Sequence, residues 1–343
     1  MMVVRKLYKS WNSKAYDQVN FANSFAMHRL KIIVSIAIIL CVKSLTLAQP
    51  TQNHLNGKIP VRNLGPIINS PQEDHYPFLS HDGSTLFFTS RRPVPGGESV
   101  GDKFWIAKHD NKVADTIWSN PEYLSSLNDF KACGSICFDT NKHAYIAASE
   151  TGGVDIWEIS ILSTGKLYPH ILQSPISTAA WESSPTITLD GNTIIFSSDR
   201  IDSKGKRGKK INLFISHRSS EGRWSEAVDL GSTINIGDLQ GTPNISPDGL
   251  FLFFCSKSDS SGRDIFFSKS IGNSDTSWSK PIRLPEYINS NAQDMCPVIT
   301  NDGKKIIFAS NRAGGYGGLD IYEAELPKEI QDMIKDSYNL SKR

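Results

Sequence analysis

Cysteine is scarce in this sequence, and no pattern of cysteine and histidine has the spacing of a zinc site. The chain has five cysteines, of which Cys133 and Cys137 fall on one predicted strand. Four residues of extended chain separate these two thiols by about 13 Å, which is too far for a disulfide. We therefore expect packed thiols and no metal, with a long-range disulfide as the alternative.

A hydrophobic run long enough to cross a membrane as a helix is also missing. The apolar run at residues 32–42 follows basic residues and precedes small residues that suit signal peptidase cleavage. This pattern predicts a secretory signal peptide over Met27–Ala48, with an uncleaved anchor as the alternative. Residues 1–26 are then a dispensable extension or a long basic start of the signal. Cys41 lacks the small preceding residue of a lipoprotein site, so we expect no stable membrane insertion after cleavage.

Strong net charge is absent as well. The whole chain carries 37 Lys and Arg against 35 Asp and Glu, and removing residues 1–48 leaves 30 against 34, a net charge of −4. A mildly acidic domain is a poor nucleic-acid binder, so we do not expect nucleic acid as a partner. The basic loop around Lys206 is interpreted as a solvated surface loop, with contact to an anionic glycan or lipid phosphate as the alternative.

Motifs for common enzyme chemistry are missing too. The chain shows no Ser-His-Asp order, phosphate loop or His-Glu helix motif. Its Asp-Gly pairs differ from the Asp-box of sialidases, in which one residue separates Asp from Gly. We therefore name no catalytic residue and expect no cofactor.

What the sequence does contain is a repeat. An Asp-Gly pair, typical of a tight hairpin turn, recurs after strand-like residues. A degenerate copy at Asp139-Thr140 fills the one gap, so that the copies lie 57, 51, 58 and 54 residues apart. Each copy continues with an apolar strand and then a third strand. The four pairs are Asp82-Gly83, Asp190-Gly191, Asp248-Gly249 and Asp302-Gly303.

Five repeats of roughly 50 residues, all strand and turn, predict an all-β chain that forms a five-bladed β-propeller of four-stranded antiparallel blades. A fourth strand precedes the first repeat, and the last repeat lacks one. We therefore predict that residues 61–69 complete the blade of residues 293–326, because this pairing removes exposed sheet edges. The propeller domain is expected over residues 49–326. The charged tail at 327–343 has apolar residues spaced for one short helix.

The repeats resemble the TolB-type, WD40-like β-propeller family of bacterial cell-envelope proteins. The segments SPDG at 246–249 and SNRAGGYGGLDIY at 310–322 are close to the central motif of that family. The resemblance extends over roughly residues 60–326. It implies an exported binding or scaffold module, in the periplasm or at the outer membrane or outside the cell of a Gram-negative bacterium, and it implies no reaction.

Acids and arginines recur together in three repeats. An acid stands three residues before the proline of the first strand, and an Arg stands fifteen residues after that proline. In repeat four these places hold Gln240 and Ser258, and in repeat two, aligned on Gly134, they hold Lys131 and Ser149. Antiparallel pairing brings the two places opposite each other, which favours a structural ion pair in each blade, with acids facing the central channel as the alternative. The predicted pairs are Asp74–Arg92, Glu182–Arg200 and Asp294–Arg312.

The loops that enter the first strand and leave the second strand of each repeat share one end of the ring, which we call the loop face. The Asp-Gly turns lie at the other end, which we call the turn face. Aromatic residues on the loop face could stack on a sugar or peptide, or they could cap the core. The candidate ligand-binding residues are Asp74, His75, Tyr76, Trp181, Glu182 and Asp294.

Two functional hypotheses follow. The first is an exported, non-enzymatic propeller that binds an envelope protein or glycan at the loop face. The second is a glycan-active hydrolase, a glycosidase or a sialidase-like enzyme, that uses channel carboxylates, for which Asp74, Glu182 and Asp294 are the only candidates. It requires two carboxylates about 5–10 Å apart that no Arg neutralises.

Overall fold

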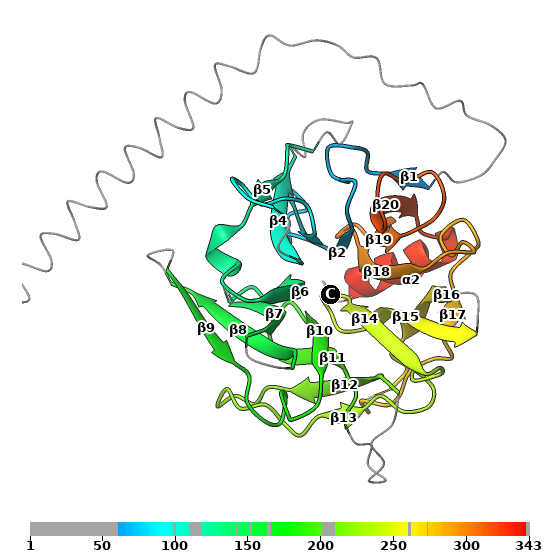
Figure 1. Cartoon of the computed structure of the whole chain (residues 1–343). Helices are drawn as coiled ribbons and strands as arrows, with labels where there is room; N and C mark the ends of the chain where they lie inside the picture. Colours follow the sequence, from blue (N-terminus) through cyan, green and yellow to red (C-terminus); the bar gives the residue numbers. More distant parts are fainter. Residues whose placement is uncertain are drawn as a thin grey trace, which may run out of the picture. The chain divides into compact units, whose positions relative to one another are not determined.

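The structure is a computed structural model that describes residues 61–340, except 99–100, 110–117, 142, 151–152, 163–165, 201–209, 260–261 and 273. The predicted signal peptide and the extension before it lie outside these residues. The described chain forms five antiparallel sheets of four strands, arranged as blades around a central axis (Figure 1). The predicted five-bladed β-propeller is confirmed. No helix among the described residues has the length and apolar character needed to cross a membrane.

The blades follow one another in chain order. Blade 1 consists of β2 (Asp74–Leu79), β3 (Thr85–Ser90), β4 (Lys103–Lys108) and β5 (Glu122–Tyr123), and blade 2 of β6 (Ala132–Phe138), β7 (His143–Ser149), β8 (Asp155–Ile161) and β9 (Leu167–Ile171). Blade 3 consists of β10 (Glu182–Ile187), β11 (Thr193–Ser198), β12 (Asn212–His217) and β13 (Val228–Asp229), and blade 4 of β14 (Leu239–Ile245), β15 (Phe251–Asp259), β16 (Gly262–Lys269) and β17 (Ile282–Arg283). Blade 5 consists of β18 (Asp294–Ile299), β19 (Lys305–Ser310), β20 (Asp320–Glu325) and β1 (Arg62–Asn63). The 3-10 helix η1 (Ser125–Leu127) precedes β6, and helix α2 (Lys328–Leu340) follows β20.

The ring closes in blade 5, where β1 pairs antiparallel with β20. Arg62 lies opposite Glu323, and their side chains form an ion pair at 3.3 Å. Further along, the amide of Leu64 donates a hydrogen bond to the carbonyl of Ile321 at 3.0 Å. The first and last strands of the propeller therefore share one blade, as the orphan strand at residues 61–69 predicted, and β20 has a partner on its outer edge.

Four of the five inner hairpins share one turn chemistry. In blade 5, Asp302 Oδ1 accepts hydrogen bonds from Thr300 Oγ1 at 2.6 Å and from the amide of Lys304 at 3.1 Å. Gly303 follows with a φ of +67°, in the left-handed region that glycine adopts without steric cost. Blades 1, 3 and 4 repeat this arrangement around Asp82, Asp190 and Asp248.

Blade 2 differs, and the predicted turn copy at Asp139-Thr140 is wrong in its register. Asp139 directly follows β6 and its amide donates to the carbonyl of His143 at 3.1 Å, so the turn lies between these two residues. The Asp139 carboxylate instead accepts hydrogen bonds from the amides of Asn141 and His143 at 2.8 and 2.9 Å. The first hairpin of blade 2 is thus one residue pair longer than the hairpins of the other blades, and its turn is one residue shorter. The distance between repeats does not reveal this difference.

The innermost strands carry β-bulges at the centre of the ring. In four blades a residue with positive φ stands in the bulge directly before a proline, which has no N–H group to leave unpaired there. Cavities along the axis measure only about 90 and 30 Å³, so side chains fill most of the centre. The four residues with positive φ are Tyr76, Ser184, Thr242 and Cys296.

The four cysteines of the described residues are buried free thiols, as predicted. Burial raises the pKa of Cys133 to about 12. Such a thiol stays protonated at neutral pH and is a poor nucleophile or metal ligand.

Helix α2 packs on the turn face, where Figure 1 shows it beside blade 5 and pointing toward the axis. Ile330 and Ile334 are buried in the same apolar cluster as Phe308 of β19. Near the end of the helix, Ser337 Oγ donates a hydrogen bond to Asp248 Oδ2 of blade 4 at 3.0 Å. The tail predicted as a short helix therefore covers part of the turn face.

Candidate functional site

The three acids of the loop face lie in ion pairs with the arginines of their own blades. Each carboxylate is fully buried, and each guanidinium is largely buried. The N–O distances are 2.6 Å for Asp74–Arg92, 3.2 Å for Glu182–Arg200 and 2.6 Å for Asp294–Arg312. All three predicted pairs are therefore formed, and none of these acids is left with a free negative charge.

Blade 3 shows how completely each carboxylate is satisfied. Glu182 accepts hydrogen bonds from the amide and the hydroxyl of Thr178 at 3.0 and 2.7 Å. It also accepts one from Ser198 Oγ at 2.9 Å, on the strand opposite. Together with Arg200 these donors occupy both carboxylate oxygens. Such a carboxylate is a poor general acid, base or nucleophile, because each role requires a free lone pair or an exchangeable proton.

The arginine of each pair joins two blades. Arg200 Nη1 donates to the carbonyl of Pro175 at 3.0 Å, and Nη2 donates to the carbonyl of Ile176, in the connection that leaves blade 2. The guanidinium also lies 4.9 and 5.0 Å from the ring centroids of Phe196 and Phe214. Blades 1 and 5 make equivalent contacts. Each pair therefore ties the first two strands of its blade to the connection that leaves the preceding blade.

The two blades without the pair are built differently. In blade 4, Gln240 takes the place of the acid and is 1% exposed. The oxygen and nitrogen of its side-chain amide have no hydrogen-bond partner among the described residues. In blade 2 the strand register places Ala132 opposite Ser149, so the predicted equivalence of Lys131 with the acids is corrected by one residue. Among its described residues, blade 2 has no arginine that donates to the connection leaving blade 1. Lys103 of blade 1 donates there instead, from its ammonium to the carbonyl of Asn128 at 3.0 Å.

The predicted aromatic residues of the loop face are held in place by the protein. His75 Nε2 lies 3.1 Å from Asp102 Oδ1, and the Arg91 guanidinium contacts the same oxygen at 2.8 Å. The His75 and Tyr76 rings are 4.7 Å apart, and burial raises the pKa of Tyr76 well above its usual value. Trp181 belongs to blade 3, where its amide donates to Asp199 Oδ1 at 2.8 Å. The structure thus brings His75 and Tyr76 together in blade 1, apart from Trp181.

A polar pocket of about 420 Å³ opens on the loop face between blades 4 and 5. Lys257 and Arg263 of blade 4 line one side, and Asn291, Gln293 and Asn311 of blade 5 line the other. Asn311 Oδ1 accepts a hydrogen bond from the amide of Gln293 at 2.9 Å, which fixes the side chain in the wall. The pocket offers two cations and several amide groups, so it suits ligands rich in hydrogen-bond acceptors.

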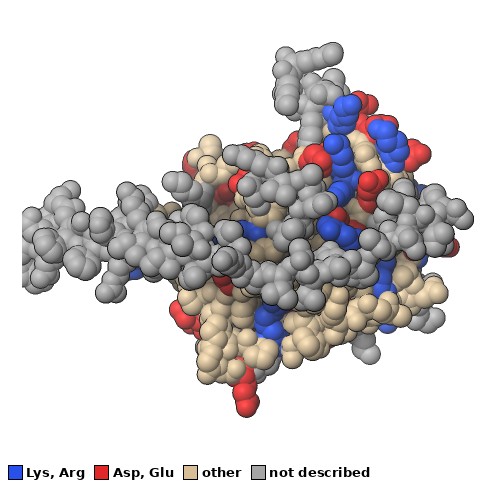
Figure 2. Space-filling view, turned by 90° about the horizontal axis from the view of Figure 1, so that it is seen from above, with Lys and Arg blue, Asp and Glu red and all other residues tan. Residues whose placement is uncertain are grey.

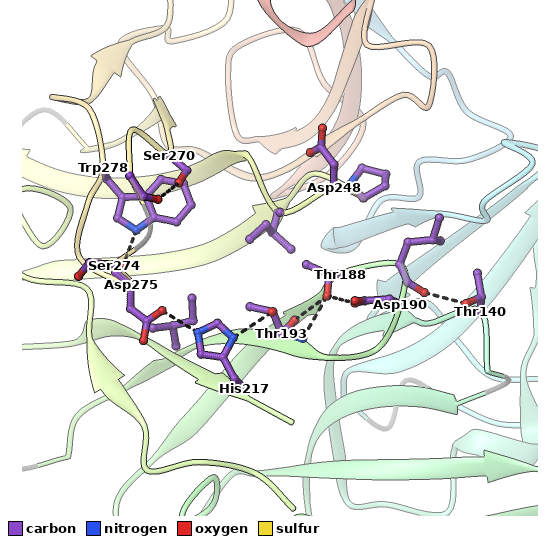
Figure 3. Close-up of a pocket in the computed structure, with 16 residues that line it drawn as sticks. Thr140, Thr188, Asp190, Thr193, His217, Asp248, Ser270, Ser274, Asp275 and Trp278 are labelled. Carbon is purple, nitrogen blue, oxygen red and sulfur yellow. Dashed lines mark hydrogen bonds and ion pairs between the residues drawn. The ribbon is translucent and has the colours of Figure 1, made fainter. Parts of the chain in front are cut away.

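A larger pocket of about 590 Å³ lies on the turn face between blades 3 and 4 (Figure 3). His217 stands in it between Thr193 of its own blade and Asp275 of blade 4. No three His, Cys, Asp or Glu side chains of the described residues are grouped so that they could hold a metal ion. On the face shown in Figure 2, basic and acidic side chains are intermixed.

The sequence did not point to either pocket. Asp190 and Asp248 occupy the repeated turn position, which turn chemistry explains, and the other lining residues come mostly from loops that differ between repeats, so the repeat pattern does not mark either pocket as a site. The proximity of His217 and Asp275, 58 residues apart, is visible only once the blades are stacked.

No protein-family model and no curated protein matches the chain. Solved structures are similar to it at low identity. A TolB structure from Agrobacterium tumefaciens is 15% identical over 78% of this chain and 97% of its own, with a TM-score of 0.46. A glycoside hydrolase is 11% identical over 78% and 92%, with a TM-score of 0.51. A family-43 endo-arabinanase from Bacillus licheniformis is 14% identical over 76% and 97%, with a TM-score of 0.48. At these identities the likeness concerns the fold alone.

Proposed function

We propose that this chain is an exported, non-enzymatic β-propeller of the TolB-type, WD40-like family, which binds a cell-envelope protein or glycan on its loop face. The observation that carries the proposal is the neutralisation of the three buried acids Asp74, Glu182 and Asp294 by arginines of their own blades. These three carboxylates are locked in ion pairs, so none of them is free to act as the acid or base of a hydrolase.

The pocket between blades 4 and 5 supplies the recognition chemistry of that face. Its volume of about 420 Å³ falls within the usual range for ligand sites, roughly 300–1,000 Å³. Lys257 and Arg263 would bind carboxylate or phosphate groups, and the amides of Asn291 and Gln293 would bind hydroxyl or peptide groups. Acidic segments of a protein and acidic glycans both present such groups.

The glycan-hydrolase alternative has less support. It requires two carboxylates about 5–10 Å apart with at least one of them free to exchange a proton. Asp74, Glu182 and Asp294 were the candidates, and each lies in a buried ion pair. The cavities along the axis, at about 90 and 30 Å³, are also smaller than the roughly 300 Å³ of a typical ligand site.

The test is a capture experiment from envelope extracts with matched variants. The purified chain, a Lys257→Ala/Arg263→Ala double variant and an Asp302→Asn control on the turn face are immobilised at equal density. The ligands found are then titrated one by one, together with a panel of acidic and neutral glycans. The proposal expects binding by the wild type and the control and a loss of at least tenfold in the double variant.

Two outcomes would contradict this proposal. One is equal binding by the loop-face double variant and the wild type. The other is turnover of a glycoside that Glu182→Gln abolishes while the fold is retained. Export is tested separately, because amino-terminal sequencing of the mature chain should begin at Gln49.

A further inference from the structure

The turn face carries a second pocket that the proposed function does not use. It measures about 590 Å³ and is formed by the turns of blades 3 and 4, on the opposite side of the ring from the loop face. Its lining combines an apolar floor, which includes Ile215, Ile245 and Trp278, with walls of hydroxyl and carboxylate groups (Figure 3). Of the 16 described residues that line it, none is Lys or Arg.

A histidine bridge joins the two blades at the edge of this pocket. His217 Nε2 lies 2.6 Å from Asp275 Oδ1, and Nδ1 lies 3.1 Å from Thr193 Oγ1. The Trp278 ring nitrogen donates to the carbonyl of Asp275 at 2.8 Å, which holds the loop that carries this carboxylate. The bridge thus fixes one oxygen of Asp275 and leaves the carboxylate, about one-third exposed, beside the cavity.

Two further carboxylates complete an acceptor-rich wall. Asp190 Oδ1 accepts from Thr188 Oγ1 and Asp248 Oδ2 from Ser337 Oγ, so neighbouring hydroxyls already orient both groups. Burial raises the pKa of Asp190, but the hydrogen bonds from Thr188 and Asn192 outweigh it and hold the pKa below its usual value. The wall therefore offers oxygen acceptors for a ligand that carries many donors.

We propose that this pocket binds a sugar ring that carries a free amino group, an amino sugar without acidic substituents. The apolar floor fits the C–H face of a sugar ring, and the carboxylates and hydroxyls fit its O–H groups. The ammonium group would balance the charge of the carboxylates, because the described lining contains no Lys or Arg and its imidazole, His217, is engaged by Asp275. An acidic sugar would face the same carboxylates and be repelled.

Three sugars with the same ring but different charge separate the contribution of the ring from that of the ligand charge: glucosamine, N-acetylglucosamine and glucuronate. Binding to the whole chain is followed by NMR or calorimetry at pH 7 and low salt. We expect millimolar binding of glucosamine, at least fivefold weaker binding of N-acetylglucosamine, and none of glucuronate. Raising the salt to about 0.5 M should weaken glucosamine binding severalfold, because exposed charges are screened.

Variants test the location. Asp275→Asn should weaken glucosamine binding at least fivefold, and His217→Gln, which removes the bridge, should do so too. Asp302→Asn is the matched control, since Asp302 occupies the same turn position as Asp190 and Asp248 but does not line the pocket. Thermal unfolding of each variant shows whether it remains folded.

The proposal is overturned if glucosamine at about 50 mM produces no signal, or if glucuronate binds as tightly as glucosamine. It is equally overturned if Asp302→Asn weakens binding as much as Asp275→Asn does, since binding would then not be located in the pocket. None of these outcomes bears on the loop face, whose ligands are tested with different variants.

Discussion

The Glu182–Arg200 pair makes a quantitative prediction about stability. Glu182 is fully buried, and the Arg200 side chain is 13% exposed. Glu182→Gln would leave a buried guanidinium without its counter-ion, which costs about 3–5 kcal/mol of unfolding free energy. Arg200→Ser should cost at least as much, because it strands the carboxylate and also removes donors from the carbonyls of Pro175 and Ile176.

The double variant, Glu182→Gln with Arg200→Ser, leaves no unpaired charge. Its cost should therefore be smaller than the sum of the single costs, by about 1–3 kcal/mol. It should still fall well below wild-type stability, because blade 4 is adapted to its glutamine in ways that blade 3 is not. There, Ile236 stands where blade 3 has Thr178, and the backbone at Gly237 approaches the adjacent strand closely.

Urea unfolding of the purified propeller at pH 7, followed by fluorescence, measures all three variants. Glu221→Gln is a matched control, because it removes one partner of the Glu221–Arg223 ion pair, whose side chains are 66% and 80% exposed. The control should cost less than about 1 kcal/mol. A Glu182→Gln protein within 1 kcal/mol of wild type, or strict additivity of the two single changes, would refute the argument that the pair is buried and coupled.

Three further predictions concern closure, packing and pH. Deleting residues 61–70 removes the outer strand of blade 5, so the truncated protein should aggregate in light scattering, and a soluble monomer of unchanged stability would contradict the closure. Gly303→Ala and Gly83→Ala both place a side chain at positive φ, which costs about 1–2 kcal/mol of unfolding free energy each. Only the new Cβ at residue 303 meets Ile334 of α2, so urea unfolding should show Gly303→Ala to be more destabilising than Gly83→Ala by about 1–3 kcal/mol. Equal costs of the two changes would argue against the helix contact. Hydrogen bonds from Ser80 and Ser84 lower the pKa of Asp82 from 3.8 to about 2, so the contribution of Asp82 to stability is present above pH 4 and lost as the pH falls toward 2. Asp82→Asn should remove that part of the pH dependence of the unfolding free energy. An unchanged dependence of stability on pH in this variant would contradict the prediction.

The sequence predicted the blades and the ion pairs because both repeat. The spacing from the proline of the first strand to the acid and to the Arg is the same in blades 1, 3 and 5, since their hairpins have the same length. Blade 2 broke the rule because its hairpin is one residue pair longer, which moved the alignment on Gly134 by one residue. An error of that size is invisible without a strand register.

The contacts that loop residues make, within a blade or between blades, could not be predicted in the same way. The pairing of His75 with Asp102 joins residues 27 apart, and the bridge from His217 reaches into the next blade. Neither contact has a copy elsewhere in the ring that would have marked it. Loop conformations and the stacking angle of the blades decide such contacts, and both depend on packing rather than on local sequence.

The seam in blade 5 also determines the order in which the molecule can assemble during synthesis. The segment around Arg62 emerges from the ribosome early, and its partner Glu323 follows 261 residues later. Four blades can form before β1 and β20 pair, so the ring closes last. Because β1 and β20 are the strands farthest apart in the sequence, their pairing carries the largest loss of chain entropy.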